Sequence, residues 1–487
     1  MYSIKNARHL YNIRYIEDIS YEKEAGDVVL ADQISSVTFM LKSDIDWKEF
    51  EQNGQLYNSY DTAANIKLSS LNNLLVDSDG SYIENVTRFN CDFPSISQVR
   101  ERDVINGNNK KIMGISVSEI SNALYGIYFS TENDITVMDD NRPTGFVNVN
   151  YGEIKDLKLD KITASGSNFV GGFCGINAGK INSLETLNTD DVSLIMGKKH
   201  VGGITGFQIP TETNLEIKGL VNRAQVEGVE AVGGIMGMIR NDFRFSDIDL
   251  EELGGLSAQE KQLLDDPSAL TVKIYDCENY GAIAGVNSSE LRGVYAAKTS
   301  QGSAQGTTKQ GADDVTEPRY IGGIVGYCYN QNVDDTTKIT IENCTSAPQY
   351  DSDKLLTILS DKSELNRRLK GVYVGGIVGY NYFGQINNSS TKTASGQEGY
   401  LFGYRYVGGI VGFNIGPASG IVGSDTSGQG ENNNHVIAYE YAGGITGCNA
   451  NVRDVDSENH NISGKAGWTF SAGCGKKSAC KNRQLGQ

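Results

Sequence analysis

Short runs of alternating apolar and polar residues recur along the chain and predict β-strands. Three of them are GEIKDLKLDKI at Gly152–Ile162, VKIYDCENYGAIAG from Val272 and KITIENCTS from Lys338. Alternation at period two is typical of a strand with one buried and one exposed face. The pattern therefore predicts an all-β protein.

A glycine-rich phrase comes back seven times between these runs. It consists of a small or β-branched residue, two glycines, an apolar residue that is isoleucine in six copies, a variable residue and a third glycine. Successive copies are 31, 31, 89, 53, 33 and 35 residues apart. Repetition at such a period predicts a stack of one supersecondary unit. The copies are VGGFCG from Val170, VGGITG from Val201, VGGIMG from Val232, IGGIVG from Ile321, VGGIVG from Val374, VGGIVG from Val407 and AGGITG from Ala442.

The repeated unit is predicted to be made of strands. Two adjacent glycines would each weaken a helix by roughly 1 kcal/mol relative to alanine. Valine and isoleucine beside glycine instead suit a short strand that bends sharply or lets another backbone come close. Short strands, a fixed period and glycine corners predict a β-solenoid, in which each turn lies about 4.8 Å from the one before.

Stacking would place equivalent residues in columns. The isoleucines and valines of the phrases are expected to form two apolar columns inside the stack. Asn177, Asn381, Asn414 and Asn449 follow the third glycine by two residues. They could form a ladder of side-chain amides or serve as turn residues in the left-handed region, and both interpretations remain open. The column residues are Ile204, Ile235, Ile324, Ile377, Ile410 and Ile445, and Val201, Val232, Val374 and Val407.

Several segments resemble a known family. VGGIVGYNYFGQI from Val374 and VGGFCGINAGKI from Val170 are similar to the GLUG motif of bacterial extracellular proteins. IKNARHLYNI from Ile4, FMLKSDIDW from Phe39 and FPSISQVRERDVINGNNKKIMGISV from Phe93 resemble the segments that precede such repeats. The resemblance extends over most of residues 1–450. Related repeats occur in surface adhesins and in the non-catalytic region of IgA-specific metalloendopeptidases. The resemblance therefore implies a secreted, right-handed parallel β-helix.

The chain divides into three predicted regions. Residues 1–150 would hold an N-terminal cap and irregular first turns, with an amphipathic capping helix over Ser3–Tyr15 and Ser3 as its N-cap. Residues 151–450 would be the repeats, and residues 451–487 a non-repeat tail. Helical or loop insertions are expected near 240–270, 288–319 and 350–370. They would either carry specificity for a partner or be decoration without one.

Composition and charge exclude some partners. The chain has 487 residues, 57 glycines and a formal net charge of −17, with no run of 18 apolar residues. Such acidity disfavours nucleic acid and anionic membranes as partners, and nothing in the sequence predicts membrane insertion. Because no signal peptide opens the chain, we expect it to be part of a longer polypeptide that is secreted or attached to the cell surface.

Few residues of the chain belong to a recognisable catalytic or metal-binding motif. Five of the eight cysteines occupy repeat positions as small buried residues, while Cys474 and Cys480 in the tail could pair or bind metal. None of the four histidines belongs to a His-Glu-x-x-His motif, and His200 is expected to be a strand-end residue. Asp44 and Asp46 are interpreted as a turn, and Asp77 and Asp79 lack the glutamate of a calcium loop. No catalytic, cofactor-binding or metal residue is therefore nominated.

These patterns favour a non-enzymatic adhesive or spacer stalk that binds a host or glycan ligand. One alternative is the non-catalytic repeat region of a large secreted metallopeptidase. Another is a carbohydrate-active β-helix enzyme, which would carry clustered carboxylates on one face.

Overall fold

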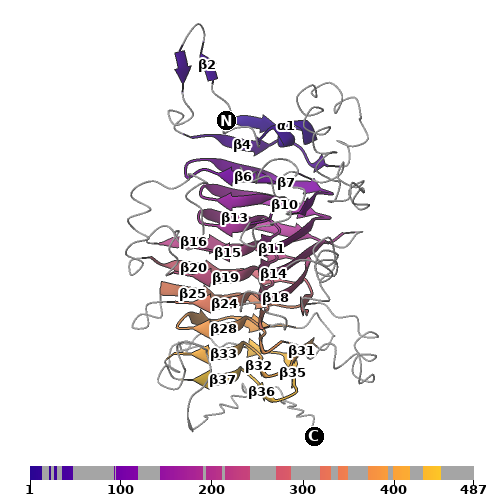
Figure 1. Cartoon of the computed structure of the whole chain (residues 1–487), viewed down its shortest axis with the longest axis vertical. Helices are drawn as coiled ribbons and strands as arrows, with labels where there is room; N and C mark the ends of the chain where they lie inside the picture. The colour runs from indigo at the N-terminus through magenta and orange to yellow at the C-terminus, as the bar shows by residue number, and fades with distance from the viewer. Residues whose placement is uncertain are drawn as a thin grey trace, which may run out of the picture.

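The protein is an elongated parallel β-solenoid (Figure 1). The computed structural model describes residues 1–13, 21–23, 27–29, 36–47, 93, 95–118, 143–189, 193–210, 214–241, 270–286, 319–330, 338–348, 371–392, 399–416 and 431–450. The N-terminus lies at one end of the stack, and the last described strands lie at the other. The predicted fold class is confirmed.

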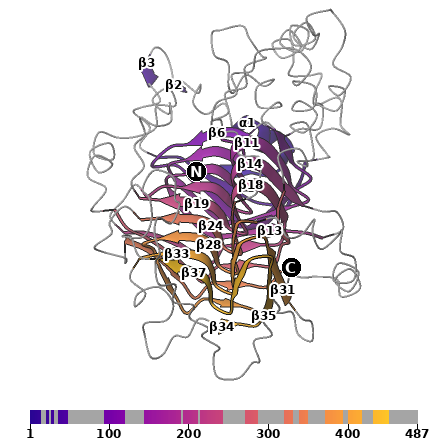
Figure 2. The ribbon, with the colours of Figure 1, turned by 60° about the horizontal axis from the view of Figure 1, so that its bottom comes forward.

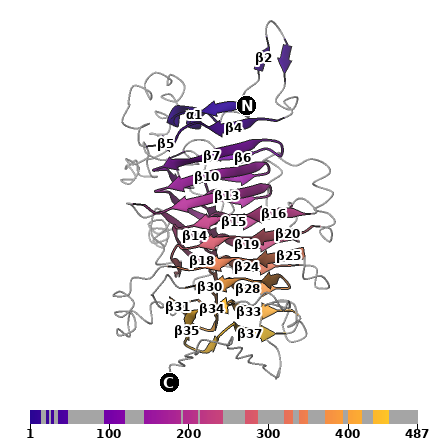
Figure 3. The ribbon, with the colours of Figure 1, turned by 180° about the vertical axis from the view of Figure 1, so that it is seen from behind.

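Three sheets of parallel strands run the length of the stack (Figures 2 and 3). The first, called here the long sheet, contains β1 (Tyr2–Ile4), β4 (Thr38–Leu41), β5 (Ile45–Asp46), β7 (Val104–Met113), β10 (Glu153–Asp160), β13 (Lys180–Leu187), β16 (Leu215–Lys218), β17 (Val221–Asn222), β20 (Val272–Tyr275), β21 (Glu278–Asn279), β25 (Ile339–Glu342), β26 (Thr345–Ser346), β29 (Gln385–Asn387), β30 (Ser390–Thr391) and β34 (Glu431–Asn432). The second sheet contains β8 (Ser116–Ser118), β11 (Thr163–Gly171), β14 (Leu194–Gly202), β18 (Gln225–Gly233), β22 (Ile283–Gly285), β23 (Tyr320–Gly322), β27 (Tyr373–Gly375), β32 (Tyr406–Gly408) and β36 (Tyr441–Gly443). The third sheet contains β6 (Ile96–Val99), β9 (Val147–Asn150), β12 (Cys174–Asn177), β15 (Thr205–Gln208), β19 (Met236–Arg240), β24 (Val325–Tyr329), β28 (Val378–Tyr382), β33 (Val411–Ile415) and β37 (Thr446–Ala450).

One coil of the solenoid visits the three sheets in turn. The chain passes from β10 in the long sheet to β11 and β12, and then returns to the long sheet as β13, beside β10. The glycine phrase forms the corner between the second and third sheets. Two small pairs stand apart from the three sheets: antiparallel β2 (Tyr21–Lys23) with β3 (Asp27–Val29), and parallel β31 (Gly399–Gly403) with β35 (Asn434–Ala438).

Each of the three glycines in a phrase is required by a different close approach. In the copy from Val232, an added Cβ at Gly233 would overlap the Met236 carbonyl oxygen within the same corner. At Gly234 it would overlap the next coil, and at Gly237 the backbone nitrogen of Val201 in the previous coil. The phrase therefore repeats because every coil meets the same three steric limits.

The isoleucine column is confirmed. Its six members line the main core, and the first five are fully buried while Ile445 is half-buried. Their backbones follow each other directly, since the Ile204 nitrogen donates to the Ile235 oxygen at 3.0 Å and the Ile410 nitrogen to the Ile445 oxygen at 2.8 Å. The valines also align in a column, with Ile321 between Val232 and Val374, but they pack in two smaller clusters beside the main core.

The amide ladder is the interpretation that the structure supports for the asparagines. Asn177 accepts from Asn150 and donates to Gln208, both at 2.6 Å. Asn381 donates to Asn414 at 2.9 Å, and Asn414 donates to Asn449 at 2.5 Å. None of the four predicted residues has a positive φ, so the turn interpretation is wrong. The ladder consists of two runs, Asn150–Asn177–Gln208 and Asn381–Asn414–Asn449, within which each amide donates to the next, and Ile239 and Cys328 separate them.

The N-terminal helix is shorter than predicted. Helix α1 spans Ala7–Asn12, and its N-cap is Asn6, whose side chain accepts from the His9 nitrogen at 2.9 Å. Ser3 lies in β1 and caps nothing, because Tyr2–Ile4 pair with β4 as the first rung of the long sheet. Leu10 is buried against the core at this end, so the helix covers the first coil as expected.

The predicted insertions fall mainly on residues 242–269, 287–318 and 349–370, which lie outside the described residues. The tail 451–487, with Cys474 and Cys480, and the pair Asp77 and Asp79 also lie outside them. Their predicted roles, and the predicted boundaries of the three regions, stay predictions.

Candidate functional site: an exposed tyrosine patch

Aromatic side chains line the outer side of the corner between the second and third sheets. They come from the residue before each of the last four glycine phrases and from the third-sheet strands that follow. Equivalent rings lie in register on successive coils. The column on the second sheet is Tyr320, Tyr373, Tyr406 and Tyr441, and its neighbours on the third sheet are Tyr327, Tyr380 and Phe413.

Most of these rings cover one another. The ring centroids of Tyr320 and Tyr373 are 5.4 Å apart, and those of Tyr373 and Tyr406 are 5.6 Å apart, with nearly parallel planes. Tyr380 meets Tyr373 edge-on. Burial raises the pKa of Tyr380 above its ordinary value, and mainly burial raises that of Tyr406 to about 12, so the hydroxyls stay protonated at physiological pH. Tyr320, Tyr373 and Tyr380 therefore stabilise the stack by packing and do not form a binding surface.

The aromatic surface becomes exposed at the C-terminal end of the described stack. Five large apolar or aromatic side chains are exposed among the described residues, and two of them, Met1 and Tyr2, belong to the N-terminus. The other three are Tyr404 at 39%, Tyr439 at 51% and Tyr441 at 39% exposure. Exposed aromatic residues that gather at one place mark a candidate interaction surface.

Two triplets on neighbouring coils build this surface. Tyr404-Arg405-Tyr406 and Tyr439-Glu440-Tyr441 lie side by side around β32 and β36, because the Tyr441 nitrogen donates to the Arg405 oxygen at 2.8 Å. Tyr404 stacks on Tyr439 with centroids 5.3 Å apart, and Tyr406 on Tyr441 at 5.1 Å. We call these six residues the tyrosine patch.

An ion pair joins the two triplets. Arg405 Nε donates to Glu440 Oε2 at 2.8 Å and its second donor nitrogen reaches Oε1 at 3.3 Å, a two-point contact. The hydrogen bond to Glu440 raises the pKa of Arg405, so the pair is charged at physiological pH. The patch thus offers partly exposed, stacked aromatic rings beside a pair of charged hydrogen-bonding groups.

His200 occupies the same column position as the tyrosines, further toward the N-terminus. It lies in β14 as expected, with a φ of 53°, and its ring stacks on Phe169 at 4.9 Å. Its buried Nδ1 has no hydrogen-bond partner among the described residues. Burial, with the charges of Lys199 and Arg240, lowers the pKa of His200 to about 3.

His200 should therefore make the fold sensitive to acid. Below its unfolded pKa of about 6.5 only the unfolded chain binds the proton, so stability falls from there toward pH 3. Between pH 7.5 and 4.5, the free energy of unfolding should fall by about 2 to 3 kcal/mol more in the wild type than in His200→Phe. Phe169 shows that the column accepts this ring. Urea unfolding of both proteins at the two pH values measures the difference, and parallel pH profiles would contradict it.

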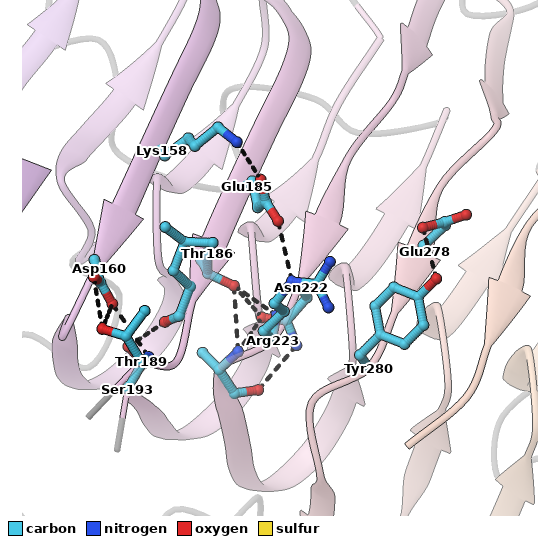
Figure 4. A network of polar contacts seen from close by, with 12 residues as sticks. Lys158, Asp160, Glu185, Thr186, Thr189, Ser193, Asn222, Arg223, Glu278 and Tyr280 are labelled. Atoms are coloured by element: carbon cyan, nitrogen blue, oxygen red, sulfur yellow. Dashed lines mark hydrogen bonds and ion pairs between the residues drawn. The ribbon is translucent and has the colours of Figure 1, made fainter. Parts of the chain in front are cut away.

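Figure 4 shows three carboxylates of the long sheet: Glu185 is paired with two cations, whereas Asp160 accepts from Thr189 and Glu278 from Tyr280. Glu185 on β13 accepts from Lys158 Nζ at 2.8 Å and from Arg223 Nε at 3.0 Å. Partial burial alone would raise the pKa of Glu185, but the hydrogen bonds and charges of Lys158 and Arg223 hold it below its ordinary value. A glycosidase general acid needs the opposite shift, so Glu185 is not suited to that role.

The remaining predicted chemistry lies in structural positions. Asp44 accepts from the Lys111 nitrogen at 3.0 Å just before β5, as expected for a turn, whereas Asp46 lies in strand β5 itself. Cys174, Cys277, Cys328, Cys344 and Cys448 are buried and free, as expected for small apolar residues of the stack. Within the described ranges, no three His, Cys, Asp or Glu side chains are grouped as metal ligands. Also within those ranges, no helix has the length and apolar character needed to cross a bilayer.

The chain has a weak similarity to a solved structure. No family model matches the chain, and no curated protein matches it either. Among solved structures, it is similar to the crystal structure of a putative immunoglobulin A1 protease from Bacteroides ovatus, at 15% sequence identity and a TM-score of 0.40. That match covers 90% of this chain and 84% of the other.

Sequence reasoning missed the tyrosine patch. A signal was present, because tyrosine lies directly before each of the last four glycine phrases: RYIGG, VYVGG, RYVGG and EYAGG. The sequence could not show where the column ends and its rings become exposed.

Proposed function

We propose that the chain is a non-enzymatic stalk of an extracellular bacterial surface or secreted protein, and that it binds a glycan through the tyrosine patch. The observation that supports this is the concentration of Tyr404, Tyr439 and Tyr441 around the Arg405–Glu440 ion pair. The apolar face of a sugar ring packs against an exposed aromatic ring, and its hydroxyls hydrogen-bond to charged groups beside it. The continuous stack with its internal ladders suits a rigid support.

A glycan array probed with the purified full chain tests the proposal. On every glycan that binds, we expect Tyr439→Ala and Tyr441→Ala each to weaken binding about tenfold, because each removes an exposed ring at the centre of the patch. Tyr2→Ala is the matched control, since Tyr2 is 40% exposed at the opposite end. It should leave binding unchanged.

Two results would contradict the proposal in different ways. If no glycan binds, or if Tyr2→Ala weakens binding as much as Tyr439→Ala, the patch is not a glycan site. If hits are cleaved and reducing ends are released, the chain is a carbohydrate-active enzyme. The role of a non-catalytic region in a large secreted metallopeptidase is tested separately, by sequencing the gene on both sides of this segment.

A further inference from the structure

Two buried cysteines lie directly above one another in adjacent coils. Cys277 connects β20 to β21, and Cys344 connects β25 to β26. The register is the same on both sides of this pair: Tyr275 pairs with Glu342 before it, and Glu278 pairs with Thr345 after it. Cys277 and Cys344 are therefore in register themselves, and the Thr345 nitrogen donates to the Cys277 oxygen at 2.9 Å.

Both side chains point the same way. Each thiol donates to the carbonyl oxygen two residues earlier, Cys277 to Tyr275 at 3.4 Å and Cys344 to Glu342 at 3.3 Å. Both are fully buried in the main core, and the Cys344 sulfur also lies 3.9 Å from the Ile274 oxygen, in the coil that carries Cys277. In-register parallel strands are about 4.8 Å apart, within the Cα separation of about 4.4 to 6.8 Å that a disulfide requires.

The other described cysteines have no such neighbour. Cys328 lies in register between Ile239 and Asn381, and Cys448 lies beside Phe413. Cys174 lies between Val147 and Thr205. Only one pair among the described cysteines is therefore placed for a bond between adjacent coils.

We propose that Cys277 and Cys344 form a disulfide that joins two successive coils, one before and one after residues 287–318 in the sequence. A small-molecule disulfide is the oxidant. One cysteine thiolate attacks it, forms a mixed disulfide and releases one small thiol. The second cysteine thiolate then attacks the protein sulfur, so the Cys277–Cys344 bond forms and the second small thiol leaves. The two cysteines lose two protons and two electrons, and the small disulfide gains them as two thiols.

The bond must form while the chain folds. In the finished stack both thiols are inaccessible, and burial raises the pKa of Cys277 well above its ordinary value, which removes the reactive thiolate. Oxidant added to the folded, reduced chain should therefore act slowly. Oxidant present during refolding should give the bond in most molecules.

The test refolds the full chain with a mixture of oxidised and reduced glutathione, denatures it with excess alkylating reagent, and maps the peptides without reduction. We expect one cross-linked peptide pair containing Cys277 and Cys344, with Cys328 and Cys448 alkylated as internal controls. Reduction should lower the midpoint of thermal unfolding by roughly 5 °C in wild type. In the double variant with Cys277→Ala and Cys344→Ala, reductant should leave the midpoint of thermal unfolding unchanged. Alkylation of both cysteines after oxidative refolding, or a cross-link from either to another cysteine, would overturn the proposal.

Discussion

Replacing Gly234 with alanine is expected to destabilise the stack by about 3 kcal/mol or more. The added methyl group would overlap the Gly323 carbonyl oxygen of the next coil and the Asn279 side chain at once. One of these is backbone, so neither a rotamer change nor a small local shift creates room. The two coils would have to separate, which also strains the isoleucine column and the hydrogen bond between Asn222 and Asn279. The midpoint of urea unfolding, followed by circular dichroism, measures the loss.

A second glycine provides the control for this experiment. Gly219 has a φ of 64°, but the nearest atoms to an added Cβ are those of Ser183, at 3.7 Å. Asparagine tolerates this backbone region, so Gly219→Asn is expected to cost less than about 1 kcal/mol. If Gly234→Ala and Gly219→Asn lose equal amounts of stability, the close approach of adjacent coils is not the reason for the repeated glycines.

The repeat could be predicted because its steric causes are local and recur in every coil. A glycine pair followed by isoleucine is a fixed phrase, so it identified both the corner and the apolar column. The amide ladder after the third glycine could be proposed but not chosen, since asparagine serves ladders and turns equally well in sequence. Only the hydrogen bonds between coils, such as Asn381 to Asn414, decide between them.

Features that depend on contacts with the neighbouring coil were not predicted from the sequence. The helix start was misplaced because Ser3 is a good N-cap in isolation, whereas Tyr2–Ile4 pair as a strand with β4. A second ladder on the long sheet was also missed, because Asn222 and Asn279 share their column with Thr186, Ser346 and Thr391. Because asparagine, threonine and serine all occur in this column, the sequence shows no repeated motif there.

Replacing Asn222 in this second ladder with alanine is expected to destabilise the protein by about 3 kcal/mol. Asn222 is fully buried, and its Oδ1 accepts from the Thr186 hydroxyl at 2.6 Å and from the Ala224 nitrogen at 3.1 Å. Its Nδ2 donates to Asn279 Oδ1 at 2.8 Å and to the Ala224 oxygen at 3.0 Å. Alanine removes all four contacts and leaves several buried partners unsatisfied, each at a cost of about 1 to 3 kcal/mol before relaxation.

Replacing Asn222 with threonine instead of alanine distinguishes the effect of lost hydrogen bonds from the effect of lost side-chain volume. Thr391 occupies this column three rungs further on and donates to Asn432 Oδ1 at 2.7 Å, so the column accepts a hydroxyl. Asn222→Thr should therefore retain part of the ladder and cost about half as much as Asn222→Ala in urea unfolding. If alanine and threonine are equally destabilising, the amide contributes by filling space beside Gly203, and the ladder adds little to stability. If threonine retains stability and alanine does not, polar continuity from coil to coil helps to hold the solenoid together, in addition to the isoleucine column.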